Sequence, residues 1–447
     1  MVKIVLVGAG SRSFGPATIR DVLLSDALEE AGVELALVDL AEDRLQVAEG
    51  YARRVAEQLG RRNAKVLSTT SLEKALEGAD FAVTAIEKRK DWSWAQDFHV
   101  PRKHGFKQIY GENGGPGSHF HALRGIPMLV EVARAMEKVC PNATLLNFTN
   151  PLHKLCEAVN RLTKTPCIGM CHGVYMGRGQ VAALLEMSPE DVDVKNCGIN
   201  HFTFLQEIRD RRTGEDLYPR LKSRIEEADP LYDWHEIAMS RVLFKRYGLY
   251  PSPGTNHFGE YIWWANDFYA HQMLWYYDPA EGHPWETGKD MEFVYTMGAV
   301  STHRPVVKPE AKPWSIDDEE IRPSGEPAVP LAEAIALGKP HEFLAVNIPN
   351  EGHIPNLPER LVVEVPGKVV DGKVVGEKMK ALPEPLAAMM RLQSTIHQLL
   401  VEAYVEESKE KLLQAVLLEP TVDSYRNAVA MVNEMLELQK DLLPPLH

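Results

Sequence analysis

The sequence predicts an α/β fold: a Rossmann-like, doubly wound parallel sheet, followed by an α+β domain with long C-terminal helices. Two patterns lead to this prediction. Short apolar segments alternate with helical segments through the N-terminal part, which is the order of a parallel sheet with crossover helices. The remainder does not alternate, and from Leu382 to Leu443 it is almost wholly helical. We therefore expect two domains, residues 1–195 and residues 196–447.

The first segment has the order strand, glycine turn, helix, strand and acid. Val2–Val7 is rich in β-branched residues, and Gly8-Ala9-Gly10-Ser11 follows it directly. Glycines let the backbone approach a pyrophosphate, and a helix that opens at Pro16 supplies unpaired N–H groups. Asp39 ends the second strand, where a carboxylate accepts hydrogen bonds from a ribose diol and repels a 2′-phosphate. The segment predicts an NAD site that includes Gly8, Gly10, Ser11, Phe14 and Asp39.

The glycine pattern is incomplete, because Ser13 occupies the position of the third glycine and Asp39 lies further along than usual. The alternative is a glycine turn in another kind of α/β domain. The strand before the turn, the helix after it and the acid on the second strand together favour the nucleotide site.

Composition and charge indicate which partners and which cellular compartment to expect. The net charge of −14 over 447 residues disfavours a nucleic-acid backbone or an anionic membrane. The five cysteines have no regular spacing, which is not the pattern of a disulfide framework. No apolar run approaches the length of a membrane span, and the first residues enter a strand without room for a signal peptide. We expect a cytoplasmic protein.

Residues 87–121 break the alternation and are expected to form a long irregular segment. The segment follows a strand of the sheet, at the edge where open α/β sheets bind ligands. Five basic residues in it are candidates to pair with a uronate carboxylate, although such a charged segment is more commonly just solvated. They are Lys88, Arg89, Lys90, Arg102 and Lys103.

Two residues outside the nucleotide segment could hold a metal ion. A thiolate at Cys171 and a neutral imidazole at His201 could share a divalent ion and leave positions open for substrate oxygens. The long separation of the two residues in sequence does not support a shared metal site. Taken alone, each of them is more commonly a buried core residue. Tyr261 taken alone is also most commonly a packing residue.

Taken together, the motifs resemble glycoside hydrolase family 4, the NAD- and metal-dependent glycosidases, and the resemblance runs nearly end to end. It rests on Gly8-Ala9-Gly10-Ser11, Gly115-Pro116-Gly117, Ala122-Leu123-Arg124, Asn147-Phe148-Thr149-Asn150-Pro151, Cys171-His172-Gly173, Gly198-Ile199-Asn200-His201, Asn356-Leu357-Pro358-Glu359 and Val362-Val363-Glu364-Val365-Pro366.

The resemblance implies that Cys171 and His201 hold Mn²⁺ and that Asn150 touches the sugar. Histidine at position 172 is similar to the members that act on unphosphorylated α-glycosides, and His172 would be the catalytic acid. The base of the family aligns with Tyr261, and Tyr250 is the second candidate.

One segment departs from the family. Many members have an Asp-Arg-His run where this chain has Thr255-Asn256-His257, so Asn256 and His257 are expected among the sugar contacts. The resemblance also implies that the second domain contributes to the substrate, metal and oligomer contacts of a homodimer or homotetramer.

The implied reaction is not the paired-carboxylate hydrolysis of most glycosidases. It proceeds by oxidation at C3 of the sugar, deprotonation at C2, elimination of the aglycone, addition of water and re-reduction, so that NAD is recycled. The sugar stays open among galactose, glucose, glucuronate and galacturonate. Two other functions compete: an NAD-dependent 2-hydroxyacid or polyol dehydrogenase, and a nucleotide-binding regulatory module without turnover.

Overall fold

The computed structural model describes residues 1–11, 14–226, 237–269, 280, 282–288 and 321–447. Its N-terminal half contains six parallel strands in the order β3-β2-β1-β4-β5-β6. This is the strand order of dinucleotide-binding domains. The strands are β1 Val2–Val7, β2 Val33–Val38, β3 Ala64–Thr69, β4 Phe81–Thr84, β5 Thr144–Asn147 and β6 Cys167–Gly169.

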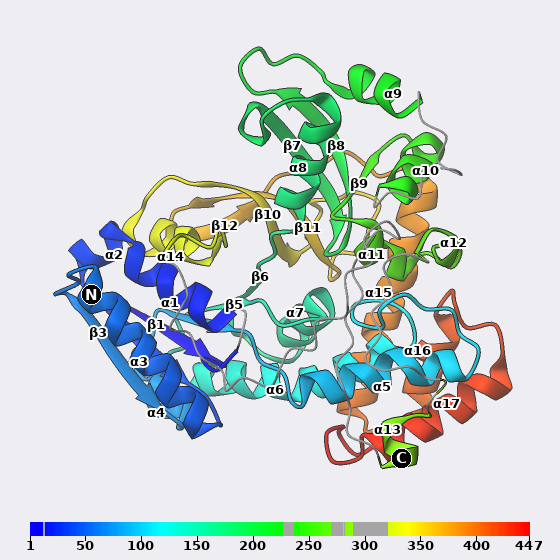
Figure 1. Cartoon of the computed structure of the whole chain (residues 1–447), viewed down its shortest axis with the longest axis horizontal. Helices are drawn as coiled ribbons and strands as arrows, with labels where there is room; N and C mark the ends of the chain where they lie inside the picture. The colour runs from blue at the N-terminus through cyan, green and yellow to red at the C-terminus, as the bar shows by residue number, and fades with distance from the viewer. Residues whose placement is uncertain (12–13, 227–236, 270–279, 281, 289–320) are drawn as a thin grey trace.

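The same sheet continues beyond β6 with strands that come later in the chain, in the order β10-β11-β7-β8-β9 (Figure 1). Each of these strands pairs antiparallel with its neighbour, and β12 pairs antiparallel with β11. The expected boundary at residue 195 falls inside β7, and the division into two domains stays a prediction. The strands are β7 Val192–Ile199, β8 Phe202–Asp210, β9 Tyr250–Ser252, β10 Glu342–Pro349, β11 Val362–Val370 and β12 Lys373–Gly376.

Alternate residues of β1 point to opposite faces of the sheet, as the pleat requires. Ile4 and Leu6 belong to an apolar cluster with residues of α1 (Phe14–Leu24) and α3 (Glu42–Gln58). Val5 and Val7 belong to another cluster, with residues of α4 (Leu72–Leu76), α6 (Gly117–Val139) and α7 (Leu152–Leu162). Because helices cover both faces, the predicted doubly wound sheet is confirmed.

The remaining helices follow the chain through both halves. They are α2 Asp26–Ala31, α5 Lys90–Lys103, α8 Gly173–Leu185, α9 Tyr218–Glu226, α10 Ala238–Tyr247, α11 Thr255–Phe258, α12 Asn266–Tyr269, α13 Pro284–Thr287, α14 Ala328–Leu337, α15 Glu384–Val405, α16 Lys409–Leu418 and α17 Tyr425–Leu438. The long C-terminal helices α15–α17 confirm that part of the prediction. In the part of the chain that the structure describes, no helix is long and apolar enough to span a membrane.

The expectation of an irregular segment over residues 87–121 is wrong for most of its length. Helix α5 occupies Lys90–Lys103, and α6 begins at Gly117. Helix α5 packs against α6 and α17, so polar residues on it are buried and paired. Asp97 forms a two-pronged ion pair with Arg124 of α6, at 2.9 and 2.6 Å. Buried polar residues erase the apolar periodicity by which a helix is recognised in sequence.

Candidate active site

The turn after β1 is held by the carboxylate of Asp39. The backbone N–H of Gly10 donates to Oδ2 at 2.8 Å, and that of Ala41 donates to Oδ1 at 2.9 Å. Gly8 has a φ of 87°, and a Cβ there would lie 2.6 Å from the carbonyl oxygen of Ala85. Each carboxylate oxygen keeps a second lone pair, which leaves acceptor capacity for a ribose diol. The turn therefore has the shape and charge expected of an NAD site.

The glycine that lets α1 approach the turn is Gly15, which the sequence analysis did not single out. A Cβ on Gly15 would lie 2.4 Å from the carbonyl oxygen of Ala9. Close packing of helix on turn is the role of the third glycine in dinucleotide folds. Helix α1 begins at Phe14, two residues before the expected Pro16, and the Phe14 ring lies 5.1 Å from that of Phe148. Ser13 lies outside the described residues.

The structure brings Cys171 and His201 together. Cys171 follows β6, and His201 lies in the tight turn between β7 and β8 with a φ of 63°. Sγ of Cys171 is 3.7 Å from Nε2 of His201. Burial, with Glu364 nearby, raises the pKa of the Cys171 thiol to about 12, and burial holds the pKa of His201 well below its usual value. A thiol that a metal deprotonates, beside a neutral imidazole, fits a divalent ion.

Two asparagines and one acid surround this pair. Nδ2 of Asn113 lies 3.1 Å from Nδ1 of His201, so Nε2 is the nitrogen on the side of Cys171. The side chain of Asn150, the expected sugar contact, donates to Oε1 of Glu112 at 3.1 Å. Asn150 is therefore hydrogen-bonded to Glu112, whose carboxylate lies beside His201.

Glu260 fixes the segment that carries Glu112 and Asn113, and the sequence analysis missed it. Its Oε1 accepts from the backbone N–H of Glu112 at 2.8 Å, and both oxygens lie within 3.2 Å of the N–H of Asn113. A Cβ on Gly114 would lie 2.5 Å from the carbonyl oxygen of Glu260. No local sequence pattern predicts this contact, because Gly114 and Glu260 are far apart in the sequence.

The two candidate bases occupy different surroundings. Tyr261 is fully buried, its hydroxyl lies 3.3 Å from the carbonyl oxygen of Asn200 and 3.5 Å from Nε2 of His153, and burial raises its pKa well above the usual value. Tyr250 belongs to β9, in an apolar cluster with residues of α8, α9 and α10. Only Tyr261 contacts the residue that precedes His201 among the contacts described for these two tyrosines. The identity of the base stays a prediction.

His172, the expected acid, is half-exposed at the start of α8. Its Nδ1 lies 2.9 Å from Oε1 of Glu326, and this hydrogen bond raises the pKa of His172. A raised pKa keeps more of the imidazole protonated near neutral pH, which suits proton donation.

The expected sugar contacts are spread over several elements. Asn256 donates to the hydroxyl of Tyr110 at 3.1 Å, and its neighbour His257 has a pKa lowered to about 4 by burial. Arg89 is exposed, with a left-handed φ of 48° directly before α5. Two of the other basic residues hold the structure together: Arg102 donates to the carbonyl oxygen of Gln108, and Lys103 forms ion pairs with Glu286 and Glu434.

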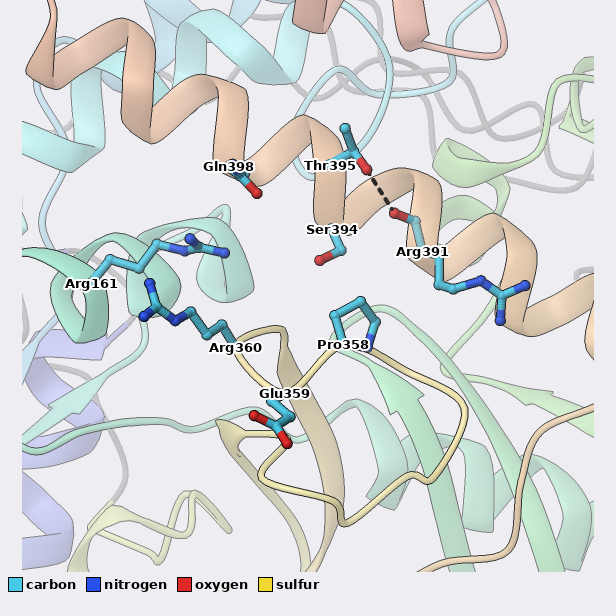
Figure 2. Close-up of a pocket in the computed structure, with 8 residues that line it drawn as sticks. All are labelled: Arg161, Pro358, Glu359, Arg360, Arg391, Ser394, Thr395 and Gln398. Carbon is cyan, nitrogen blue, oxygen red and sulfur yellow. Dashed lines mark hydrogen bonds between the residues drawn. The ribbon is translucent and has the colours of Figure 1, made fainter.

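A cavity of about 580 Å³ lies elsewhere, and Figure 2 shows its lining. It opens between α15 and the segment before β11, and none of the candidate site residues lines it. This cavity is therefore separate from the candidate site around Cys171. The lining residues are Arg161, Pro358, Glu359, Arg360, Arg391, Ser394, Thr395 and Gln398.

Comparison with known proteins shows the family of the chain. Residues 3–187 match the family described as "Family 4 glycosyl hydrolase", and residues 196–422 match "Family 4 glycosyl hydrolase C-terminal domain". The chain is similar to an α-glucosidase of Erwinia rhapontici, with 28% identity over 98% of this chain and 96% of the relative. It is also similar to an α-galactosidase of Bacillus subtilis, with 29% identity over 99% of each.

A solved structure with the same fold is that of a 6-phospho-α-glucosidase from gut microorganisms in complex with NAD and Mn²⁺. Its TM-score is 0.78, with 22% identity over 100% of both chains. The fold combines a dinucleotide-type turn after β1 with Cys171 and His201 at the carboxyl ends of β6 and β7. Together these features define a nucleotide- and metal-dependent enzyme. With the family matches, which cover most of the sequence, the chain belongs to glycoside hydrolase family 4 and is a glycosidase that acts on carbohydrates.

Proposed function

We propose that this enzyme hydrolyses unphosphorylated α-glycosides, either an α-galactoside, an α-glucoside or an α-uronide, with NAD and Mn²⁺. The observation that carries the proposal is the contact between Cys171 and His201, at 3.7 Å. Neither a plain dehydrogenase nor a regulatory module requires these side chains to meet. The names of the α-glucosidase and α-galactosidase relatives support the substrate class.

The proposal gives each side chain a task. When bound, NAD would supply a reversible hydride acceptor for C3 of the sugar, and Mn²⁺ would supply Lewis-acid stabilisation of the negative charge that develops on the sugar oxygens. The turn at Gly8 and Gly10, with Asp39, binds the nucleotide. Cys171 and His201 hold the metal ion.

Two further residues of the chain move protons. Tyr261 removes the proton from C2 in its deprotonated form, and its hydroxyl exchanges that proton with solvent before one is returned. His172 donates a proton to the leaving oxygen, and its hydrogen bond to Glu326 keeps that proton in place near neutral pH. After the aglycone leaves, water adds at C1 and gives a proton back to His172, while Tyr261 returns a proton to C2, so that both side chains regain their starting protonation states.

The choice of sugar follows from residues around the site. Asn150, Asn256 and His257 contact the ring substituents in this proposal. Arg89 is exposed and is the residue proposed to pair with the carboxylate of a uronide. Arg89→Ala should lower kcat/KM for an α-uronide and leave that for the neutral α-galactoside unchanged.

The direct experiment is a panel of 4-nitrophenyl α-glycosides: galactoside, glucoside, glucuronide and galacturonide. NAD, Mn²⁺ and a thiol reductant are each omitted in turn. Release of nitrophenol that requires all three supports the proposal, because Cys171 must stay reduced to bind metal. Release without NAD, or net NADH formation with no nitrophenol, would contradict it.

The assembly and compartment are proposed as well. We take the enzyme to be a cytoplasmic homodimer or homotetramer with a nucleotide domain over residues 1–195 and a second domain over residues 196–447. All five cysteines are free, which suits a reducing compartment. Light scattering at two concentrations would measure the mass, and a monomeric mass at both would contradict the oligomer.

A further inference from the structure

His257 lies beside His201, although its sequence position suggested only a contact with the sugar. Its helix, α11, is tied to the rest of the site through Asn256, which donates to the hydroxyl of Tyr110 at 3.1 Å. The ring centroids of His257 and His201 are 4.3 Å apart, with their planes inclined at 51°. A second imidazole is therefore held against the one that faces Cys171.

A third side chain, Glu112, reaches the same place. One ligand atom each of Glu112, His201 and His257 lies within 4.8 Å of the other two. Atoms bound to one divalent ion at about 2.0–2.3 Å are separated by about 3 Å as neighbours and about 4.5 Å across the ion. Cys171 is not in this group of three, but its Sγ is 3.7 Å from Nε2 of His201. His201 is therefore common to the group of three and to the Cys171–His201 pair.

Neighbouring amides orient these donors. Asn113 lies 3.1 Å from Nδ1 of His201, and the same amide donates to Oε2 of Glu112 at 3.1 Å. Asn150 donates to the other oxygen of Glu112. Such outer contacts are the usual supports of metal ligands.

His257 has a nitrogen that its surroundings leave unsatisfied. Its Nδ1 is buried and has no hydrogen-bond partner in the part of the chain that the structure describes. A buried polar atom without a partner is destabilising, and such atoms in folded proteins call for an explanation. A metal ion at this place would explain why the chain positions the ring here.

We propose that His257 and Glu112 are ligands of the same metal ion as Cys171 and His201. This inference rests on the proposed function, since it takes the Mn²⁺ of that function as the ion. Oxygen- and nitrogen-bound Mn²⁺ accepts six donors. Four donors from the protein leave two positions, which is the number needed for the 2- and 3-oxygens of one sugar.

The test counts nitrogens bound to Mn²⁺ by pulsed electron paramagnetic resonance of the loaded protein. The wild type should show two directly coordinated ¹⁴N nuclei, and His257→Gln should show one, because glutamine keeps much of the size and polarity but is a poor ligand. Titration with Mn²⁺ should show binding at least about tenfold weaker in this variant, by comparison with losses for outer-shell changes. His257→Cys should recover affinity and still show one nitrogen.

The matched control is His353→Gln. His353 also has a buried Nδ1 without a partner in the described residues, but it lies in the segment between β10 and β11 and outside the metal cluster. This variant should keep both nitrogens and the wild-type affinity. Glu112→Gln, in turn, should weaken Mn²⁺ binding without changing the nitrogen count.

The spectrum of the wild type decides the question even where a variant does not fold. One coordinated nitrogen in the wild type, or an unchanged count in folded His257→Gln, would overturn the inference. An active glycosidase with one nitrogen refutes the ligand set and leaves the proposed function standing. Two nitrogens in a protein that hydrolyses no glycoside of the panel would refute the function and leave the ligand set.

Discussion

Replacing Gly15 by alanine tests whether the close approach of α1 to the first turn is needed for NAD binding. The new Cβ would lie 2.4 Å from the carbonyl oxygen of Ala9, where real Cβ contacts are at least 3.0 Å. The backbone must therefore shift by about 0.6 Å, because the obstacle is a carbonyl group and not the end of a flexible side chain. Overpacking of this kind costs about 1–3 kcal/mol of the free energy of unfolding.

The same strain should reach the nucleotide. The turn and the start of α1 both face the expected pyrophosphate, so a shift of either should weaken NAD binding by about tenfold or more, at about 1.4 kcal/mol per factor of ten. Urea unfolding measures the first effect, and fluorescence titration with NAD measures the second.

Gly50→Ala is the matched control. Gly50 is exposed in the middle of α3, and a Cβ there meets nothing within 4 Å. This change should stabilise the helix by about 0.5–1 kcal/mol and leave NAD affinity unchanged. If Gly15→Ala behaves like Gly50→Ala in both assays, the close-packing argument is refuted.

Three further outcomes follow from named contacts. Asp39→Ala should weaken NAD binding and reduce the preference for NAD over NADP, since the carboxylate of Asp39 repels a 2′-phosphate. Equal affinity of the wild type for NAD and NADP would contradict this. Arg124→Met should lower the free energy of unfolding by about 3–5 kcal/mol, because it leaves the buried carboxylate of Asp97 without its ion pair, although the amide of Gln439 still donates to it. Adding Asp97→Leu should recover most of that loss in urea unfolding, and a double variant no more stable than the single one would exclude this cause. His172 must be protonated to act as the acid, and Glu326 raises its pKa, so kcat/KM should fall as the pH rises through that raised value. Glu326→Gln should move this limb of the pH profile to lower pH, and an unmoved limb would remove His172 from the role of acid.

The N-terminal half was predictable from sequence because its signals are local. A parallel strand buried on both faces is a continuous apolar run, and Val2–Val7 and Val33–Val38 are such runs. The end of each run then locates the turn or acid that follows it. Asp39 was found in this way, and it does hold the turn at Gly10.

The sequence signal failed where polar residues are buried. Helix α5 places Asp97 in the interior against Arg124, and it carries Pro101 within its length. Neither feature is typical of a helix in sequence, because the compensating partner comes from another element. The irregular segment expected at residues 87–121 is therefore mostly helical.

The candidate site shows the same limit of local patterns. Cys171 and His201 were paired from their ligand chemistry and from the family resemblance, without support from their spacing in sequence. The sheet order explains why they meet, since β10 and β11 lie between β6 and β7. Glu260 has no local motif, since its role is to accept backbone N–H groups of Glu112 and Asn113 across the fold. Contacts of this kind depend on the tertiary structure.

The central claim is that the glycosidic bond is broken by oxidation and elimination and not by direct displacement. The most direct test is complete hydrolysis of the active 4-nitrophenyl α-glycoside in D₂O, with NAD and Mn²⁺ present, followed by NMR of the released sugar. Elimination breaks the C2–H bond, and the proton returned through Tyr261 comes from solvent, so the account predicts deuterium at C2. Displacement by paired carboxylates leaves that bond untouched. Product with only hydrogen at C2 after full conversion would contradict the account.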